Sequence, residues 1–433
     1  MDTFAIMKFL KSIPVSIVQF TIVLSPLFAP FHSWAQNNNF DELLKTDMDL
    51  PISFDLRNTD RLGEIKSQPA GGCWASATMG TVESFWKTAG FSEVSLSDKN
   101  LKEFHGFVPE RNSNGNHNMA TAYFARRSGP LEAGTAADSI SENNPVTLAY
   151  ITDARYLPDD PGVVKKVIMH FGSVYSMMYH RKQNLDTISD IYYTKKEQIN
   201  HAVALVGWND TLRTRNGAGV WIAQNSLGLN YGDKGFFLIP YSDPNILKYN
   251  AVWPRWIPYD PKSQILYYDT LGSYQSYGFG DSVCYGLIKF TAGQNAVLSK
   301  VGTFVNHPET KITFTVFDDF DNNTKILSDL LFESKTFKCS LAGYYTFDLD
   351  EKIKISQSDD FFIMMKYSNF SDTIPMPVEK YIKGYSNPGI TSGKCWTNPD
   401  FEKWPSTWYE CGTNSTYQSL IFDLCIKAYM IEE

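Results

Sequence analysis

The chain has 433 residues, of which 43% are hydrophobic and 15% aromatic. This composition is sufficient for two or three folded domains and excludes a disordered chain. The formal net charge of −8 argues against a nucleic-acid partner and is typical of a mildly acidic soluble protein.

Residues 1–35 differ from the rest of the chain. Two lysines give a basic start, an apolar run follows over 13–31, and Ser33-Trp34-Ala35 forms a small-x-small cleavage signal. This order predicts a secretory signal peptide that is cleaved after Ala35. The alternative is a transmembrane anchor, which three prolines within the apolar run disfavour. We therefore expect a secreted, periplasmic or cell-surface protein with no stable membrane insertion after cleavage.

A linker and a first domain are expected next. Residues 36–50 are polar and few, which predicts a spacer or a short pro-segment rather than a folded inhibitory prodomain. Residues 51–255 are assigned to the first domain. Helices are predicted over 74–86, 119–127 and 161–171, and a further one starts with Ser95 or Ser97 as its N-cap. Residues 109–117 are predicted to form a turn-rich loop.

The later part of this domain shows strand patterns. Short apolar runs predict strands over 173–179, 201–208, 219–225 and 235–240. Helices followed by an antiparallel sheet indicate an α+β fold, whose two parts pack together and leave a cleft. Five prolines between positions 240 and 261 mark the expected junction between domains.

Residues 256–433 are expected to form an all-β domain. Helical signals are few, and the predicted strands cover 265–268, 283–290, 311–317, 344–349, 361–367 and 420–429. Many of these segments alternate in polarity, which is typical of a β-sandwich. The acidic run 318–323 is interpreted as a solvated hairpin rather than a calcium loop, because it lacks the later Glu and the Gly of such a loop.

This second domain holds five of the six cysteines, namely Cys284, Cys339, Cys395, Cys411 and Cys425. An exported protein can keep disulfides, but an odd number leaves at least one thiol unpaired. Cys395 and Cys411 bracket a short loop and are the first choice for a disulfide. The spacing of the five does not match a zinc site.

Cys73 stands alone in the first 283 residues. It follows a Gly-Gly pair and precedes the helical run, which places its thiol at or near a helix N-terminus. Backbone N–H groups and the helix dipole favour the nucleophilic thiolate there. The alternative is a buried free cysteine that packs as a small hydrophobe.

Two further residues bear on this choice. His201 opens a strand that is apolar on both faces, and Asn225 ends another apolar strand. The amide of Asn225 could accept a hydrogen bond from the imidazole of His201 and so fix its tautomer and orientation. A thiol, a base and an orienting amide are together the groups that acyl transfer by an activated thiol needs. His201 lies 128 residues after Cys73 and Asn225 lies 152 residues after it, close to the spacing in papain-type enzymes.

The first domain resembles the papain (C1) family of cysteine peptidases from about Phe54 to Pro240. The resemblance rests on Gln68…Gly72-Cys73-Trp74-Ala75, on Asn200-His201-Ala202-Val203, and on Gln224-Asn225-Ser226 with the glycines at 232 and 235. It implies a two-lobed domain with a helical lobe and an antiparallel β lobe.

The resemblance also implies roles for individual residues. Cys73 would be the nucleophile, His201 the general base and then the general acid, and Asn225 the residue that orients His201. Gln68 would supply the oxyanion-hole side chain together with the backbone N–H of Cys73. Three residues are expected to line the substrate cleft, namely Gly115, Asn116 and Asn200.

Three positions depart from the family pattern. The loop between Gln68 and Cys73 is one residue shorter than usual. Ala70 replaces a companion cysteine, so the family's usual disulfide cannot form and Cys73 is left unpaired. Leu227 replaces the tryptophan that usually shields the His–Asn pair.

The second domain resembles the lectin-like β-sandwich that follows C1 domains in some microbial secreted proteins. Tyr267-Tyr268-Asp269, the central segment 343–349, the strand at 361–363 and the late segment 392–396 carry this resemblance. It implies a shape and does not by itself imply sugar binding. Trp396, Trp404 and Trp408 could stack on a cell-surface glycan or wall polymer if exposed, or they could be packing residues.

These features predict a secreted cysteine peptidase that hydrolyses peptide bonds through a Cys-His-Asn site and an acyl-enzyme. Its partner would be a protein or peptide substrate, and no cofactor or metal is needed. Two alternatives stay open. One is a catalytically weak or inactive peptidase-like adhesin, and the other is a transpeptidase that passes the same acyl group to an amine.

Overall fold

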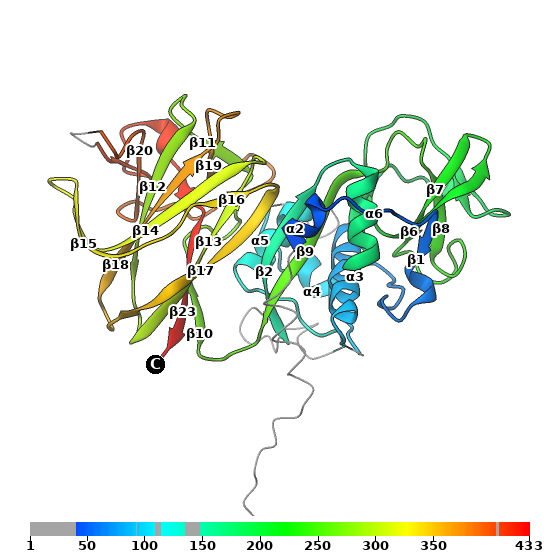
Figure 1. Cartoon of the computed structure of the whole chain (residues 1–433), viewed down its shortest axis with the longest axis horizontal. Helices are drawn as coiled ribbons and strands as arrows, with labels where there is room; N and C mark the ends of the chain where they lie inside the picture. Colours follow the sequence, from blue (N-terminus) through cyan, green and yellow to red (C-terminus); the bar gives the residue numbers. More distant parts are fainter. Residues whose placement is uncertain (1–39, 92, 109–113, 135–147, 404–406) are drawn as a thin grey trace, which may run out of the picture.

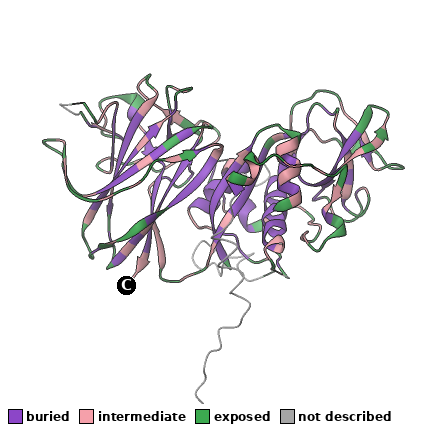
Figure 2. Cartoon of the chain, viewed as in Figure 1, coloured by how far each residue is buried: buried purple, intermediate pink, exposed green. Residues whose placement is uncertain are grey.

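The computed structural model describes residues 40–91, 93–108, 114–134, 148–403 and 407–433. A layer of helices lies between a smaller β part, at the right of Figure 1, and a larger β part at the left. Buried residues run through the helical layer and through both β parts (Figure 2). The predicted signal peptide, its cleavage site after Ala35, and Trp404 lie outside the described residues.

The helices are α2 (Phe40–Lys45), α3 (Cys73–Thr88), α4 (Asp98–Glu103), α5 (His117–Ala125) and α6 (Pro161–His170). Single 3-10 turns cover Leu56–Asn58, Lys182–Asn184 and Gln418–Leu420. The predicted N-cap Ser97 accepts a hydrogen bond from the backbone N–H of Asn100. Asp160 caps α6, where Pro161 occupies the first turn. The predicted helices are therefore confirmed, with α5 beginning two residues earlier than expected.

The strands of the smaller β part and the strands that run beside the helices belong to one sheet. Its strand pairs are antiparallel, apart from the parallel β5–β8 pair. They are β1 (Ser53–Asp55), β2 (Ala149–Leu157), β3 (Val174–Met178), β4 (Leu185–Asp186), β5 (Ile191–Tyr192), β6 (His201–Thr214), β7 (Gly217–Gln224), β8 (Phe236–Pro240) and β9 (Lys248–Pro258). Their order is β2-β9-β3-β6-β7-β8-β5-β4, with β1 paired to β6. The helices followed by a mainly antiparallel sheet are the α+β arrangement expected.

The proline-rich stretch that suggested a junction is instead partly a strand. β9 pairs with β2 on one side and β3 on the other, and Trp253 and Trp256 on it are buried. The β2–β9 register shifts around Pro254, and a proline is tolerated in a strand at such an irregularity. Pro254 therefore lies within the strand at a register shift, and Pro258 is its last residue.

The larger β part is a sandwich, as expected. Its strands are β10 (Ser263–Leu266), β11 (Gln275–Tyr277), β12 (Val283–Thr291), β13 (Ala296–Val305), β14 (Thr310–Asp321), β15 (Ile326–Glu333), β16 (Phe337–Cys339), β17 (Ala342–Ile355), β18 (Asp360–Ser368), β19 (Met376–Glu379), β20 (Cys395–Asn398), β21 (Tyr409–Glu410), β22 (Asp423–Leu424) and β23 (Ile426–Glu432). One face runs β10-β23-β13-β17 and the other β15-β14-β18-β12-β20-β21. The single strand expected over 420–429 is split into β22 and β23.

The two β parts share one continuous sheet, because β17 pairs with β2 through residues 342–344 and 154–156. Arg155 reinforces this junction. Its guanidinium donates to the Tyr344 carbonyl at 2.9 Å, lies 3.4 Å from the centroid of the Tyr345 ring, and pairs with Asp41 at 3.1 Å. The second half is therefore joined to the first by backbone pairing and by a buried charge.

The segment after the predicted signal peptide packs on the side of the helical layer. Phe40 of α2 is buried and its ring centroid lies 4.8 Å from that of Phe171. Lys166 of α6 donates to the Thr46 carbonyl at 2.6 Å. Residues 40–46 thus belong to the folded core, whichever role the full 36–50 segment has.

Two of the tryptophans considered for stacking on a glycan are core residues. Trp396 and Trp408 are each 3% exposed and pack with Tyr285, Phe320 and Phe362. Because both indole rings are buried in this cluster, a stacking role for these two is wrong.

All six cysteines are free thiols, Cys73 among them. Cys395 and Cys411 lie side by side, since the Cys411 N–H donates to the Cys395 carbonyl at 2.9 Å. Their disulfide is not formed here and stays a prediction. The acidic run forms the β14–β15 hairpin, where the Asp321 carboxylate accepts from the N–H of Asn323.

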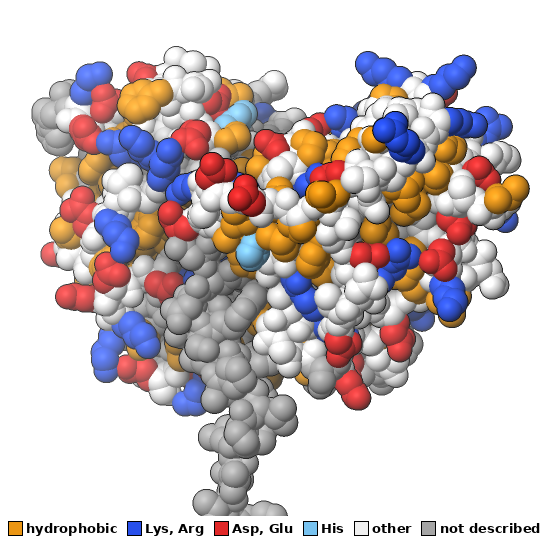
Figure 3. All heavy atoms as spheres, turned by 45° about the vertical axis from the view of Figure 1, so that its right-hand side comes forward, with side chains coloured by type: hydrophobic (Ala, Val, Ile, Leu, Met, Phe, Trp, Pro, Cys, Tyr) orange, Lys and Arg blue, Asp and Glu red, His pale blue; other side chains and the backbone are white. Residues whose placement is uncertain are grey.

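In the described ranges, no helix is both long and apolar enough to cross a membrane. Acidic and basic side chains are interspersed over the face shown in Figure 3, around a band of apolar side chains. The visible face therefore does not present a patch of one sign.

Candidate active site

A tight turn places Cys73 at the first position of α3. The N–H of Gly72 donates to the Pro69 carbonyl at 2.8 Å, and Gly71 has a φ of 68°. A Cβ on Gly72 would lie 2.7 Å from the Pro69 ring, so both glycines are required here. The turn explains how the shortened loop still delivers Cys73 to the helix start.

The Cys73 thiol lies against the beginning of β6. Its side chain is 4% exposed, and the backbone of Ala202, the residue after His201, hydrogen-bonds to it. Burial raises the pKa of the Cys73 thiol, and this effect exceeds the lowering by backbone N–H groups at the helix start. The expected thiolate is thus not favoured by the helix alone, and a nearby base has to accept the proton.

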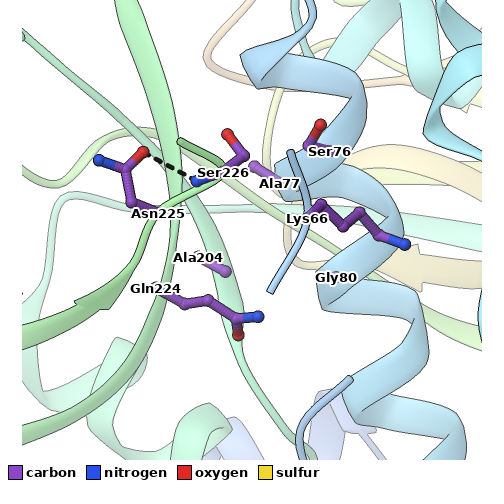
Figure 4. Close-up of a pocket in the computed structure, with 8 residues that line it drawn as sticks. All are labelled: Lys66, Ser76, Ala77, Gly80, Ala204, Gln224, Asn225 and Ser226. Carbon is purple, nitrogen blue, oxygen red and sulfur yellow. Dashed lines mark hydrogen bonds between the residues drawn. The ribbon is translucent and has the colours of Figure 1, made fainter. Parts of the chain in front are cut away.

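His201 and Asn225 come together at the ends of neighbouring strands. The Nε2 atom of His201 lies 2.9 Å from Oδ1 of Asn225, and both side chains are buried, at 6% and 2% exposure. The same Oδ1 accepts the N–H of Ser226 at 2.8 Å (Figure 4), which fixes the amide's orientation. An amide oxygen only accepts, so Nε2 carries the proton and Nδ1 is the basic nitrogen.

Burial also governs the His201 imidazole. It lowers the pKa of His201 to about 4, while the Asn225 hydrogen bond acts in the opposite direction. Burial thus favours the neutral form of both the Cys73 thiol and the His201 imidazole. Ionisation of the pair then requires transfer of the Cys73 proton to His201, as in general-base activation of a nucleophile.

Gln68 is held beside this pair. Its backbone N–H donates to the Ser226 carbonyl at 2.8 Å, and its side-chain Oε1 accepts the Ser226 hydroxyl at 2.6 Å. With Oε1 occupied, the side-chain NH₂ group is the part of the amide that can donate. A donor at this position has the chemistry that an oxyanion hole needs.

A recess lies between α3 and the strands that carry the His–Asn pair. Figure 4 shows the residues that line it, namely Lys66, then Ser76, Ala77 and Gly80 on α3, Ala204 on β6, Gln224 at the end of β7, and Asn225 and Ser226 directly after β7. Lys66 pairs with the buried Glu83 at 2.7 Å. This ion pair ties the segment that precedes the Cys73 turn to the middle of α3.

His180, which the sequence analysis did not single out, lies beside His201 and is itself held by Tyr231. The ring centroids of His180 and His201 are 4.6 Å apart, and His180 Nε2 lies 2.9 Å from the Tyr231 hydroxyl. Leu227, where the family has its shielding tryptophan, is 39% exposed. The aromatic cover of His201 thus comes from His180, which Tyr231 holds in place. Motif spacing gave no signal for His180, because it follows the end of β3, whereas His201 opens β6.

The three predicted substrate-binding residues, Gly115, Asn116 and Asn200, differ in their exposure and in their contacts. Asn200 is exposed, but its amide bonds to both the N–H and the carbonyl of His180, at 2.7 and 3.0 Å. Gly115 is buried against Trp74, where a Cβ would lie 2.3 Å from the indole. Asn116 caps α5 by accepting the Met119 N–H at 3.1 Å. Asn114, next to Gly115, donates to the Asn200 carbonyl at 3.4 Å, so the two groups of residues meet.

Across the part of the chain that the structure describes, His, Cys, Asp and Glu side chains form no group of three or more placed to hold a metal ion.

A two-part α+β domain with Cys, His and Asn at the meeting of its helix and strands is the architecture of papain-like cysteine peptidases. The model of the papain family cysteine proteases matches residues 50–250, and that of lectin-like domains matches residues 265–430. The first region is therefore a papain-like cysteine peptidase domain, and the second is a lectin-like domain.

Individual relatives agree with this assignment. The first region is 26% identical over 200 residues to a viral cathepsin of Adoxophyes honmai nucleopolyhedrovirus, covering 44% of this chain and 57% of the relative. It is 25% identical over 209 residues to mouse cathepsin K, covering 45% and 61%. The chain thus spans about three fifths of the length of these relatives.

A solved structure matches both domains together. It contains the cysteine protease and lectin-like domains of Cwp84, a surface layer associated protein of Clostridium difficile. It superimposes with a TM-score of 0.74 over 90% of each chain, at 18% sequence identity. The two chains share the fold and the order of the two domains.

Proposed function

We propose that the chain is a cysteine peptidase that hydrolyses peptide bonds through an acyl-enzyme. The observation that carries the proposal is the 2.9 Å contact of His201 Nε2 with Asn225, which leaves Nδ1 basic beside the strand start that holds the Cys73 thiol. The match of the first region to the papain family supports it.

The proposed steps follow from these residues. His201 Nδ1 removes the thiol proton, the Cys73 sulfur attacks the peptide carbonyl, and the C–N bond breaks as His201 protonates the leaving amine. Water, deprotonated by His201, then attacks the thioester and releases the carboxylate and the free thiol. Gln68 and the N–H of Cys73 donate to the oxyanion in both halves.

Hydrolysis of an unfolded protein substrate tests the proposal. Wild type should cleave it and lose activity after treatment with an epoxide inactivator of cysteine peptidases, whereas Cys73→Ala should be inactive from the start. Ser226→Ala keeps Cys73, His201 and Asn225 but removes the hydroxyl that donates to Oε1 of Gln68. This variant should retain part of the activity. Activity that survives in Cys73→Ala would contradict the proposal. A wild type that is folded but inactive would favour the adhesin alternative.

Adding an amine acceptor separates hydrolysis from transpeptidation. The proposal expects the carboxylate as the main product, because water reaches the acyl-enzyme. Predominant transfer of the acyl group to the amine, detected by mass spectrometry, would instead support the transpeptidase alternative.

We also propose that the protein is exported, with domains at 51–255 and 256–433. The basic and apolar start with its cleavage signal supports export, as does the surface location stated for Cwp84. Sequencing of the mature N-terminus should find Gln36 first. A start at Met1 would contradict this. Contact of the lectin-like domain with a glycan or wall polymer stays a prediction.

A further inference from the structure

A loop of the lectin-like domain reaches the papain-like domain near its candidate site. The loop, residues 380–386, is closed by hydrogen bonds between Ile382 and Ser386, both at 3.0 Å, and by one from the Tyr385 N–H to the Ile382 carbonyl at 2.9 Å. Gly384 has a φ of 74°, which allows the tight return. The loop therefore presents Tyr385 on a small closed frame.

Tyr385 makes several contacts with the first domain. Its ring centroid lies 5.0 Å from that of Phe107, and its carbonyl accepts the Val108 N–H at 3.0 Å. Its hydroxyl lies 3.2 Å from Nδ2 of Asn116 and 3.3 Å from Oδ1. Tyr274, also from the second half, supports the ring from 4.6 Å. The hydroxyl is thus aimed at one side chain of the other domain.

Asn116 links this contact to the site. Its Oδ1 already accepts the Met119 N–H as the cap of α5, and the Tyr385 hydroxyl holds the rest of the amide. The preceding Gly115 packs on the indole of Trp74, which follows Cys73 in the chain. A short series of contacts therefore runs from Tyr385 through Asn116 and Gly115 to the residue next to the thiol.

We propose that Tyr385 is a positioning residue for peptide substrates, which holds the 114–116 segment in place from the lectin-like domain. The inference rests on the proposed peptidase function, in which this segment binds extended substrate backbone. Holding a binding segment in its bound position before the peptide arrives lowers the cost of ordering it on binding. Tyr385 makes no contact with His201 or Asn225 among the described hydrogen bonds and ring pairs, so its loss should affect substrate binding more than chemistry.

Tyr385→Phe removes only the hydroxyl and tests the proposal. With peptides that extend several residues before the scissile bond, KM should rise roughly three- to tenfold while kcat changes less than about twofold. Tyr381→Phe is the matched control, because Tyr381 lies in the same loop and is 58% exposed. It should leave KM unchanged.

Asn116→Ser gives a second route to the same contact. Serine still caps α5 but is too short to reach Tyr385. It should raise KM as Tyr385→Phe does, and the double variant should add little to either change. An unchanged KM in Tyr385→Phe, or an equal rise in Tyr381→Phe, would overturn the proposal.

Binding to an inactive protein separates this inference from the proposed function. The dissociation constant of the same peptides for Cys73→Ala should rise three- to tenfold when Tyr385→Phe is added. Weakened binding with an inert wild type would leave the inference standing and refute the peptidase proposal. Normal hydrolysis by wild type, with unaltered peptide binding when Tyr385→Phe is added, would support the peptidase proposal and refute the positioning role of Tyr385. Failure of Cys73→Ala to bind any peptide would contradict both.

Discussion

The two halves of the chain bury the same reactive side chain in different surroundings. Burial raises the pKa of Cys73 in the papain-like half, and it raises the pKa of Cys284 in the sandwich to about 12. Cys284 contacts the sulfur of Met376 and the hydroxyl of Thr397, whereas Cys73 lies at a helix start beside the strand that carries His201. Burial alone therefore does not mark a reactive thiol, and the neighbouring base does.

Buried histidines with shifted pKa values lie in the papain-like half, and the sandwich buries carboxyls with shifted pKa values. In the papain-like half burial lowers the pKa of His105, His117 and His201 to about 4 and that of His180 to about 3, where the charge of His201 contributes. In the sandwich burial raises the pKa of Asp423 to about 7 and that of Glu379 to about 8, with a contribution from Asp269. The papain-like half also buries Glu83, whose pKa burial raises. The buried histidines and the buried carboxyls should therefore make stability respond to pH in opposite directions.

The junction between the halves gives the largest expected effect. Arg155→Ala removes a buried cation that bonds to Asp41 and to the Tyr344 carbonyl. Losing one member of a buried network costs about 3–5 kcal/mol, which urea unfolding would measure. Lys354→Ala, which removes an exposed partner of Glu433, should change stability by less than about 1 kcal/mol. Similar small losses in both variants would show that the junction does not depend on Arg155.

The opposite pH responses can be tested with one variant from each half. Unfolded histidines bind protons below about pH 6.5 that the folded ones do not, so they lower stability as pH falls from 6.5 toward 4. Folded Glu379 keeps a proton that an unfolded glutamate releases above about pH 4.5, so it lowers stability as pH rises toward 8.

Glu379→Gln should therefore reduce the loss of stability between pH 5 and pH 8, on the order of 2 kcal/mol. His117→Gln should reduce the loss between pH 6.5 and pH 4 by a similar amount. Urea midpoints across this pH range measure both. If the two variants gave curves parallel to wild type, the contrast between buried histidines and buried carboxyls would be wrong.

Asn225→Ala sharpens the contrast at the site. Without the amide, His201 loses the acceptor that fixes its tautomer, and kcat should fall on the order of 10²-fold. Asn225→Asp keeps an acceptor and should recover part of the rate. Steady-state kinetics on one peptide substrate give both values. Unchanged kcat in Asn225→Ala would mean that His201 needs no orienting group.

His180 is expected to have the smallest effect of this series. His180→Ala removes the ring that covers His201 and should lower kcat about tenfold, since water then competes for the His201–Asn225 bond. His180→Phe restores the aromatic cover without the Tyr231 bond and should recover most of the rate. The pH dependence of kcat/KM should shift in His180→Ala. Equal losses in both variants, with an unaltered pH profile, would indicate a packing role only.

Much of the fold could be predicted from local patterns. The helix after Cys73, the Ser97 cap and the strand from His201 follow from spacing and capping chemistry that act within a few residues. β2 could not be predicted, because Asp153 and Arg155 interrupt its apolar pattern. Those charges are buried, and they are satisfied by Thr346 and Tyr344 of the second half and by Asp41 of α2. Partners from more than a hundred residues away leave no local signal.

The candidate site divides in the same way. Cys73, His201 and Asn225 stand in recognisable local sequences, and the structure brings His201 and Asn225 into contact. The roles of His180 and Tyr385 depend on contacts across strand ends and across domains. Neither has a local pattern, so only the folded chain shows them.

The rates at which the six thiols react test the central claim most directly. The native protein is exposed to a small alkylating reagent over a range of pH, and mass spectrometry follows each cysteine separately. We predict that Cys73 reacts fastest of the six, and that His201→Ala slows it, because His201 accepts the thiol proton as the sulfur attacks. The five sandwich thiols should react only after unfolding. A native Cys73 that reacts as slowly as Cys284, or no faster in wild type than in His201→Ala, would contradict the account.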